Sequence, residues 1–417
     1  MAHDEMKRTD RRTFLQAGAL AGASAMTLAP GAGAQDAPAK AGDPAGVLPK
    51  RRLGKTGVEV TLLEQGAARG PSADRVLKFA FARGVRLFDT AKVYGTEINF
   101  KKWFAQEPEV RKQIVLVTKD MPRRPSDMLK MVDQRLAALG TDYIDFLFIH
   151  GLGDEPMGIN NSIKFIKSQE FKEVADKIRK SGKARFIGFS AHHVERARLI
   201  QAAAEDGVVD AIMLQYRPWL DKDSPLNKAL DAAWKKGIGL ISMKQIATQA
   251  FGDKPKGDIL KEVVERVPVL AEKKLKPYQG LLQAIWSDER ISAACVSMRN
   301  TEQIRENADA AARFEPLKTA EIHQLRDAFR AHGPTLCADC EGQCALAAGT
   351  QAELGNLTRF LTYYQKLGDR AEARRQYAKL SAEARDWSGA DLEAARAACP
   401  DRLDFAKLLP EVDPHLA

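Results

Sequence analysis

The chain is predicted to fold as an α/β protein: a (β/α)8 barrel with a C-terminal, mostly helical extension. Eight short apolar runs rich in β-forming residues recur along the chain, and amphipathic segments separate them. Strands that alternate with helices form a parallel sheet, and about 250 residues is the usual length of such a barrel. The expected strands are Glu59–Gly66, Val85–Thr90, Ile114–Lys119, Ile144–His150, Arg185–Ser190, Ala211–Tyr216, Gly239–Lys244 and Ser292–Met298.

The helices between these strands are predicted from apolar residues that recur at helical spacing, with glycine close to several of the expected ends. No G-x-G-x-x-G motif follows a strand and no P-loop is present, so a Rossmann-type nucleotide fold is not indicated. The clearest expected helices are Ser126–Leu139, Ser162–Lys180, Val194–Ala204 and Pro225–Lys236.

The composition is that of a soluble globular protein with a moderate basic excess. Of the 417 residues, 45% are hydrophobic and 29% are charged, and 64 Lys and Arg outnumber 55 Asp and Glu. The basic residues are spread along the chain and are not interleaved with aromatic residues in one stripe. We therefore expect no nucleic-acid partner, whereas acidic ligands such as a phosphate-bearing cofactor fit this charge.

The N-terminus has the features of an export signal. Arg11 and Arg12 precede Phe14-Leu15, a weakly apolar Ala- and Gly-rich run follows, and Ala32-Gly33-Ala34 suits cleavage. We expect residues 1–34 to be a removed twin-arginine signal that takes the protein through the twin-arginine export machinery to the periplasm. The alternative is a retained anchor, but the run is too short and Gly-rich to span about 30 Å of hydrocarbon.

The remaining chain divides into three predicted parts. Residues 35–50, rich in Ala, Pro, Gly and Asp, read as a flexible linker. The barrel is expected over residues 51–317. From residue 318 to residue 417 the sequence becomes helical and rich in Arg and Ala, and it holds four of the five cysteines.

Four polar residues stand at or just after the ends of three expected strands: Asp89, Tyr94, Lys119 and His150. Carboxyl ends of barrel strands converge on one face, so these side chains are expected to meet there. A lysine cation paired with an aspartate can lower the cost of a phenol giving up its proton, as carbonyl reduction requires. Each residue alone has an ordinary structural explanation, as a helix cap, packed aromatic, strand end or core histidine. The set of four favours catalysis.

Two segments resemble the signatures of the aldo-keto reductases. Residues 84–97 (GVRLFDTAKVYGTE) are similar to the first signature and residues 136–150 (LAALGTDYIDFLFIH) to the second. The resemblance covers roughly residues 50–312 and implies reduction of an aldehyde or ketone by hydride from a nicotinamide cofactor. It implies that Tyr94 is the general acid, that Lys119 and Asp89 tune it, and that His150 orients the carbonyl group.

The same resemblance implies a cofactor site for NADP(H) or NAD(H). Ser190 and Gln215 correspond to the pair that holds the nicotinamide carboxamide, and Arg299 with Asn307 corresponds to part of the adenosine-phosphate site. Met243 and Lys244 stand where many relatives carry a stacking aromatic. Further departures are Ala191 in place of Asn, and Ser297, Met298 and Gln303 in place of the Lys, Ser and Arg of members that prefer NADP. Arg299 is then left to bind a 2′-phosphate.

Four cysteines of the extension resemble a ferredoxin-type pattern with a long insertion before its last member: Cys337, Cys340, Cys344 and Cys399. The resemblance implies that they bind a 4Fe-4S cluster, for which four thiolates suffice. Disulfides are the main alternative, because the export signal leads to an oxidising compartment, and structural zinc or free thiols remain open. Cys295, inside the eighth expected strand, reads as an apolar residue.

Two functions other than carbonyl reduction remain open from the sequence. The first is an exported iron-sulfur electron-transfer protein in which the barrel serves as a scaffold. The second is an accessory subunit that binds nucleotide without turnover. The complete set of four site residues favours the reductase.

Overall fold

The computed structural model describes residues 46–154, 156–193, 195–220, 222–245, 264–332, 342–365, 370–399 and 402–417. The chain divides into two units, Met1–Asp43 and Pro44–Ala417. The expected signal, residues 1–34, precedes the first described residue, 46, and lies outside the described residues. Within the described ranges, no helix is both long and apolar enough to cross a bilayer.

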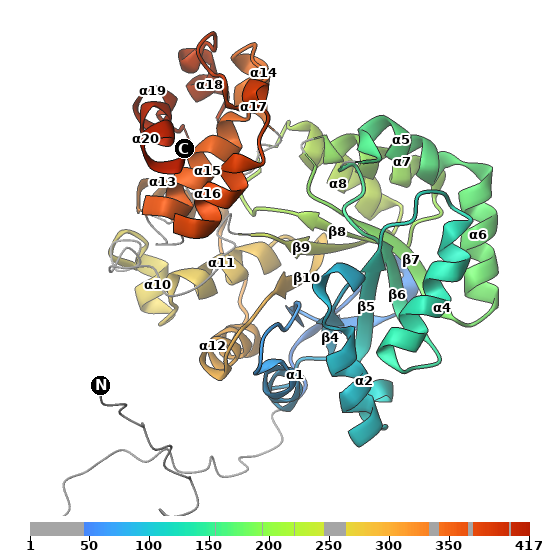
Figure 1. Cartoon of the computed structure of the whole chain (residues 1–417). Helices are drawn as coiled ribbons and strands as arrows, with labels where there is room; N and C mark the ends of the chain where they lie inside the picture. The colour runs from blue at the N-terminus through green and yellow to red at the C-terminus, as the bar shows by residue number, and fades with distance from the viewer. Residues whose placement is uncertain are drawn as a thin grey trace, which may run out of the picture. The chain divides into compact units, whose positions relative to one another are not determined.

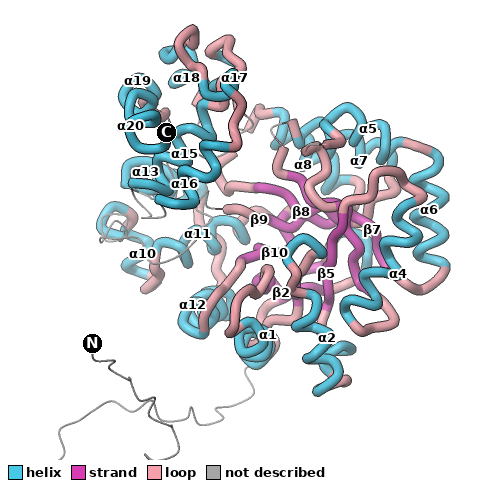
Figure 2. The backbone as a smooth tube through the Cα atoms, viewed as in Figure 1, coloured by secondary structure: helices cyan, strands magenta, loops and turns pink. Residues whose placement is uncertain are grey.

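Eight parallel strands close into a barrel, which confirms the predicted fold (Figures 1 and 2). Neighbours pair in chain order, and the last strand closes on the first. The strands are β3 (Leu63–Gln65), β4 (Leu87–Asp89), β5 (Val115–Asp120), β6 (Ile144–Ile149), β7 (Ala184–Ala191), β8 (Ala211–Gln215), β9 (Gly239–Met243) and β10 (Ile291–Val296).

Helices surround the barrel (Figure 1). Several begin at a side-chain cap: Ser168 accepts from the N–H of Phe171, and Ser224 accepts from that of Asn227. The helices are α1 (Ala73–Ala82), α2 (Glu97–Gln106), α3 (Val110–Gln113), α4 (Asp127–Leu139), α5 (Gly158–Lys167), α6 (Gln169–Lys180), α7 (Arg196–Asp206), α8 (Pro225–Lys235), α10 (Pro268–Glu272), α11 (Pro277–Trp286), α12 (Thr301–Ala312) and α13 (Thr319–His332).

Three sequence-based boundaries need correction. The segment 59–66 is two strands: β2 (Glu59–Thr61) pairs antiparallel with β1 (Lys50–Arg52), and β3 alone enters the barrel. The segment 162–180 is two helices, because the cap at Ser168 starts α6. The last residues of the expected linker belong to the fold, since Leu48 is buried and Lys50 begins β1.

The β1–β2 hairpin closes the amino-terminal end of the barrel. Leu53 and Val60 belong to the same buried cluster as the barrel interior. A Cβ on Gly239, the first residue of β9, would collide with the side chain of Leu53, so this contact requires glycine. With this end covered, the opposite end, at the carboxyl ends of the strands, remains for a site.

The barrel interior is filled by every second residue of each strand. Phe146 and Phe148 of β6 both project inward, and Phe146 stacks on Phe186 of β7 at 5.0 Å between ring centroids. Gly188 of β7 has no side chain where Phe148 and the backbone of Ala211 approach. The amino-terminal half of the interior is therefore a packed aromatic and aliphatic core.

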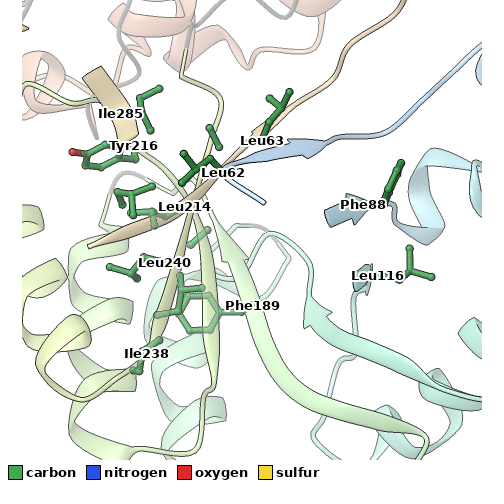
Figure 3. Close-up of a cluster of buried hydrophobic side chains, with 14 of the residues drawn as sticks. Leu62, Leu63, Phe88, Leu116, Phe189, Leu214, Tyr216, Ile238, Leu240 and Ile285 are labelled. Atoms are coloured by element: carbon green, nitrogen blue, oxygen red, sulfur yellow. The ribbon is translucent and has the colours of Figure 1, made fainter. Parts of the chain in front are cut away.

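The outward-facing residues form a second core between the strands and the helices (Figure 3). Phe88, Leu116, Phe189 and Leu240 in the figure are all buried strand residues of this layer. Trp103 of α2 is fully buried and packs edge-to-face on Phe88 at 5.7 Å. Its role is packing.

The C-terminal extension has a hydrophobic core of its own. Leu354, Leu357, Phe405 and Leu409 are among its buried residues. The helices that supply it are α14 (Gln343–Ala347), α15 (Leu354–Gln365), α16 (Arg370–Ala378), α17 (Ala382–Arg385), α18 (Leu392–Ala398), α19 (Phe405–Leu408) and α20 (Val412–Leu416). The predicted helical extension is present.

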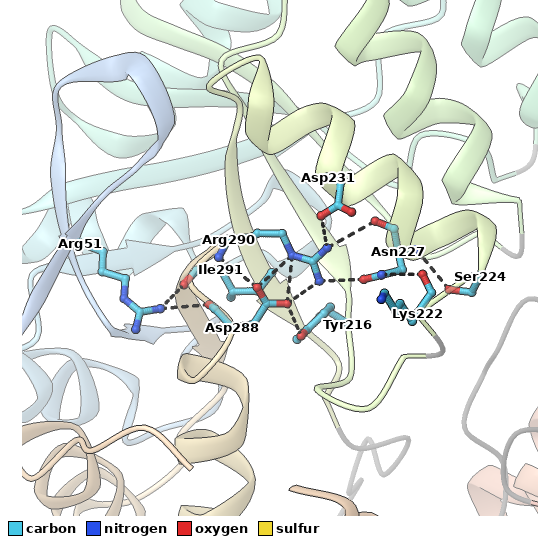
Figure 4. A network of polar contacts seen from close by, with 9 residues as sticks. All are labelled: Arg51, Tyr216, Lys222, Ser224, Asn227, Asp231, Asp288, Arg290 and Ile291. Atoms are coloured by element: carbon cyan, nitrogen blue, oxygen red, sulfur yellow. Dashed lines mark hydrogen bonds and ion pairs between the residues drawn. The ribbon is translucent and has the colours of Figure 1, made fainter. Parts of the chain in front are cut away.

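A polar network around Arg290 ties β10 to α8 and to the end of β8 (Figure 4). The Arg290 guanidinium donates to Asp288 at 2.7 Å, to Asp231 at 2.6 Å and to the side chain of Asn227 at 2.8 Å. The Tyr216 hydroxyl also donates to Asp288, at 2.7 Å. Burial would raise the pKa of Asp288, but the hydrogen bonds and charge of Arg290 outweigh burial and hold it below its usual range.

Replacing Arg290 by Met should lower the free energy of unfolding by about 2 kcal/mol, because it leaves the largely buried Asp288 carboxylate without its cation. Because the pKa of Asp288 is lowered in the folded state, the stabilisation by its pair with Arg290 is complete at pH values above the usual carboxyl pKa. It is lost as the pH falls through the lowered pKa. Chemical denaturation at neutral and acidic pH measures both. Arg313→Met, which breaks an exposed pair with Asp309, is the control and should cost less than about 1 kcal/mol.

Candidate active site

The four predicted site residues, Asp89, Tyr94, Lys119 and His150, come together at the carboxyl end of the barrel and are called the tetrad below. Asp89 and Lys119 continue the inward-facing positions of β4 and β5, two residues beyond Leu87 and Val117. The Lys119 ammonium forms an ion pair with the Asp89 carboxylate and donates to the backbone oxygen of Thr90 at 3.1 Å. Lys119 and Asp89 are only 1% and 3% exposed, so the pair is shielded from solvent.

Tyr94 reaches this pair from a short 3-10 helix, η2 (Lys92–Tyr94), that follows β4. Its hydroxyl lies 3.3 Å from Nε2 of His150, and the two rings meet edge-to-face. The Lys119 ammonium is 5.4 Å from the centre of the Tyr94 ring. One phenol thus lies against an imidazole and a buried cation, as the sequence predicts.

The protonation states follow from burial and from these neighbours. Burial would lower the pKa of Lys119, but the charge of Asp89 outweighs it and the net shift is upward, so Lys119 remains a cation. Burial raises the pKa of Tyr94, and the Lys119 charge opposes that rise. Burial lowers the pKa of His150 to about 3, aided by the charge of Lys119, so this imidazole is neutral over the physiological range.

Two charged residues near this tetrad were not anticipated. Arg69, on the loop after β3, places its guanidinium 4.7 Å from the centre of the Tyr94 ring. Glu64 lies inside the barrel on β3 and is fully buried. Arg69 is an exposed loop residue without periodicity, so no pattern marks it. Glu64 had a signal, a carboxylate within an apolar run.

The predicted nicotinamide-binding residues lie at the ends of adjacent strands. Ser190 of β7 and Gln215 of β8 are 1% and 2% exposed. The Ser190 hydroxyl accepts from the N–H of Gly151 at 3.0 Å, so its own hydrogen can be donated to a ligand. Met243 ends β9 and is partly exposed, and Lys244 adopts a left-handed backbone conformation with φ of 49°. A hydroxyl and a primary amide suit a carboxamide, so these residues fit a nicotinamide in kind.

The predicted adenosine-phosphate residues lie at α12. Asn300 caps this helix, accepting from the N–H of Gln303, whose side-chain oxygen in turn accepts from the N–H of Arg299. Arg299 is exposed and lies just before α12, whereas Asn307 is half-buried within that helix. An exposed guanidinium beside a helix N-terminus is suited to an anionic group.

Two of the four predicted ligand cysteines can be placed. Cys344 and Cys399 are buried in the core of the extension and are not joined by a disulfide. They lie close enough for the Cys399 thiolate, after burial itself, to help raise the pKa of Cys344 to about 11. Cys337 and Cys340 lie outside the described residues. Within the described ranges, no cluster of His, Cys, Asp and Glu has the arrangement of a metal site.

The chain is similar to proteins of one family. The sequence model of the Aldo/keto reductase family matches residues 62–329. L-galactose dehydrogenase of Arabidopsis thaliana is 27% identical over 292 residues, which cover 64% of this chain and 89% of that protein. D/L-glyceraldehyde reductase of Hypocrea jecorina is 27% identical over 233 residues, 49% of this chain and 65% of that protein.

The fold is shared with solved structures as well. An aldo-keto reductase from Bacillus halodurans, in its holo form, superposes with a TM-score of 0.53 at 21% identity, covering 67% of this chain and 96% of that one. The sequence match spans well over half of the chain and coincides with the closed barrel. The chain therefore belongs to the Aldo/keto reductase family and is an NAD(P)H-dependent oxidoreductase.

Proposed function

We propose that the protein reduces an aldehyde or ketone to an alcohol, with Tyr94 as the general acid. The observation that carries this proposal is Tyr94, whose hydroxyl lies 3.3 Å from a neutral His150 and whose ring centre lies 5.4 Å from the ammonium of the buried Lys119–Asp89 pair. The family match and the complete tetrad favour this function over an electron-transfer protein or a non-catalytic accessory subunit.

Each member of the tetrad has a separate task. His150, uncharged near neutral pH, would donate its ring N–H to the carbonyl oxygen and hold that oxygen beside the Tyr94 hydroxyl. Tyr94 transfers its proton to that oxygen. Lys119 stabilises the phenolate that remains, and Asp89 fixes the Lys119 side chain in place.

A nicotinamide cofactor supplies the hydride when it is bound. Ser190 and Gln215 would hold its carboxamide, and Arg299 with Asn307 would contact its adenosine-phosphate end. The partly exposed Met243 and the adjoining Lys244 would border the nicotinamide. Arg299 alone is a modest determinant for a 2′-phosphate, so NADP(H) and NAD(H) are both suitable donors.

Tyr94→Phe should lower kcat for carbonyl reduction by about a hundredfold to ten-thousandfold, because it removes one proton donor and leaves the shape of the pocket unchanged. Steady-state turnover of DL-glyceraldehyde with NADPH and with NADH measures this loss. Titration of the tryptophan fluorescence with each nucleotide should show unchanged binding.

The matched control is Tyr143→Phe. Tyr143 precedes β6 at the other end of the barrel, where its hydroxyl donates to the backbone oxygen of Arg111. This variant loses the same group and should keep its turnover. Equal turnover in wild type and Tyr94→Phe would remove Tyr94 from the role of general acid.

We also propose that the extension binds a 4Fe-4S cluster through Cys337, Cys340, Cys344 and Cys399. Support comes from Cys344 and Cys399, which are buried in the same, mainly apolar core, where Cys399 helps to raise the pKa of Cys344. Two thiols buried in one core are suited to a shared metal centre, and equally to oxidation when none is present.

Protein purified without oxygen from cells that assemble such clusters should contain about four iron and four sulfide ions per chain. Cys344→Ser should lose most of both, whereas Cys295→Ser, which alters a barrel thiol, should keep them. Metal analysis and visible absorption provide the readout. Iron-free protein in which alkylation finds no reactive tail thiols would instead establish disulfides.

We infer that the protein is exported to the periplasm by the twin-arginine route. Support is confined to the sequence of residues 1–34, in which Arg11 and Arg12 precede an apolar run and a small-residue cleavage site. Export of a folded chain is compatible with a cofactor loaded before transport.

Changing Arg11 and Arg12 together to Lys should abolish export of the full-length chain, because the receptor reads the arginine pair. Cell fractionation and the N-terminal sequence of the mature protein measure transport and cleavage. Arg8→Lys is the matched control and should be exported normally. Export of the double variant at the wild-type level would contradict the assignment.

A further inference from the structure

Glu64 projects into the barrel interior, beneath the tetrad. In the parallel pairing of the strands, Glu64 of β3 is opposite Leu87 of β4 and Cys295 of β10. Leu87 belongs to the interior cluster and Cys295 packs against it. Paired residues of neighbouring strands point to the same face, so Glu64 faces inward as well. Asp89 is two residues further along β4, on the same face.

The surroundings of Glu64 do not suit a charge. Its side chain is 0% exposed, and within the described part of the chain neither carboxyl oxygen has a nitrogen or oxygen hydrogen-bond partner. An ionised carboxylate whose donor is only the weak thiol of Cys295 is strongly unfavourable in a dry interior, whereas the protonated acid is tolerated. Consistent with this, burial raises the pKa of Glu64 well above its usual range, as does the negative charge of Asp89.

The groups that shift the pKa of Glu64 by their charges or hydrogen bonds lie on three other strands, β4, β5 and β10. Asp89 of β4 raises its pKa, whereas Lys119 of β5 and the thiol of Cys295 on β10 lower it without cancelling the rise. A neutral Glu64 leaves the single positive charge of Lys119 balanced by the single negative charge of Asp89. An ionised Glu64 would add a second negative charge beneath Tyr94 and make its phenolate harder to form.

We propose that Glu64 is a positioning residue for proton donation: its neutral carboxyl group keeps the Asp89–Lys119 pair electrically balanced beneath Tyr94, and loss of its proton at alkaline pH switches donation off. This inference rests on the proposed function of Tyr94. The proton stays on Glu64 through the catalytic cycle, and only the charge of the group matters. As the pH rises, the first loss of reductase activity is therefore expected from ionisation of Glu64 inside the barrel.

The direct test compares wild type with Glu64→Gln, which is a permanently neutral residue of nearly the same shape. The readout is kcat/KM for NADPH-dependent reduction of DL-glyceraldehyde across neutral and alkaline pH. Near neutral pH the two should agree within about threefold. Above the wild-type midpoint, wild-type activity should fall by about tenfold per pH unit, as for one proton, while the variant remains level until Tyr94 itself loses its proton at still higher pH. Coincident alkaline limbs would overturn the proposal.

Cys295→Ala is the matched control, because it removes the facing thiol and leaves the carboxyl group in place. It should retain an alkaline limb, moved toward higher pH because the thiol that lowers the pKa of Glu64 is gone. If the limb disappears in Cys295→Ala and persists in Glu64→Gln, the titrating group is the thiol and the proposal fails.

A second measurement does not require activity. The pKa of Glu64 is raised in the folded state. Below the usual pKa range of a carboxyl group, burying Glu64 therefore carries no ionisation cost, and the cost to the free energy of folding grows as the pH rises above that range. Glu64→Gln lacks this cost. The melting temperature of the variant should therefore exceed that of wild type by an amount that grows from pH 5 to pH 8.

The two measurements separate the possible failures. A constant difference in melting temperature across this range would overturn the neutral state of Glu64. Suppose instead that the difference in melting temperature grows with pH but neither protein reduces a carbonyl compound. The carboxyl group of Glu64 would then be neutral as inferred, whereas its coupling to Tyr94 and the proposed function would both be rejected.

Discussion

Closure of the barrel imposes the constraint on which the other features depend. In a closed sheet every second residue must point inward, and each inward position must be filled or bear a function. Near the amino-terminal ends these positions are filled by Phe146, Phe148 and neighbouring aliphatic residues, beneath the β1–β2 hairpin. At the carboxyl ends the same alternation continues through Asp89 and Lys119. The same alternation of inward-facing residues therefore produces an apolar core at the amino-terminal end of the barrel and a polar site at its carboxyl end.

Burying the charged residues of this polar site costs free energy of folding, and the pairing of the charges limits that cost. An isolated ammonium or carboxylate in the interior would be strongly destabilising, but Lys119 has Asp89 and the backbone oxygen of Thr90 as partners. The cost is tolerable because the surrounding strands are fixed by outer packing and by the network around Arg290. A rigid barrel can thus hold a charge pair in the position where a proton donor requires it.

Much of this arrangement was predictable, because strand ends are marked by polar residues after apolar runs. Asp89, Lys119 and His150 follow this rule, and Tyr94 follows β4 by five residues. The structure brings all four together, although their roles remain proposals. The division at Ser168 was missed because the apolar spacing continues across two helices, and only its cap separates them. Arg69 was missed because its position depends on a loop that carries no periodic pattern. The cofactor contacts and the cluster cannot be read from spacing alone.

Glu64 shows why a residue in an expected strand still requires the register. Within an assumed single strand from residue 59 to 66, the carboxylate of Glu64 interrupts an apolar run, but the alternation alone does not say which face of the sheet it occupies. The division into β2 and β3 places Glu64 opposite Cys295 and Leu87 and thereby inside the barrel. Burial in that position turns an ordinary acid into a neutral group beneath a charge pair. The chemical meaning of the residue thus arises from pairing geometry, which composition and periodicity do not specify.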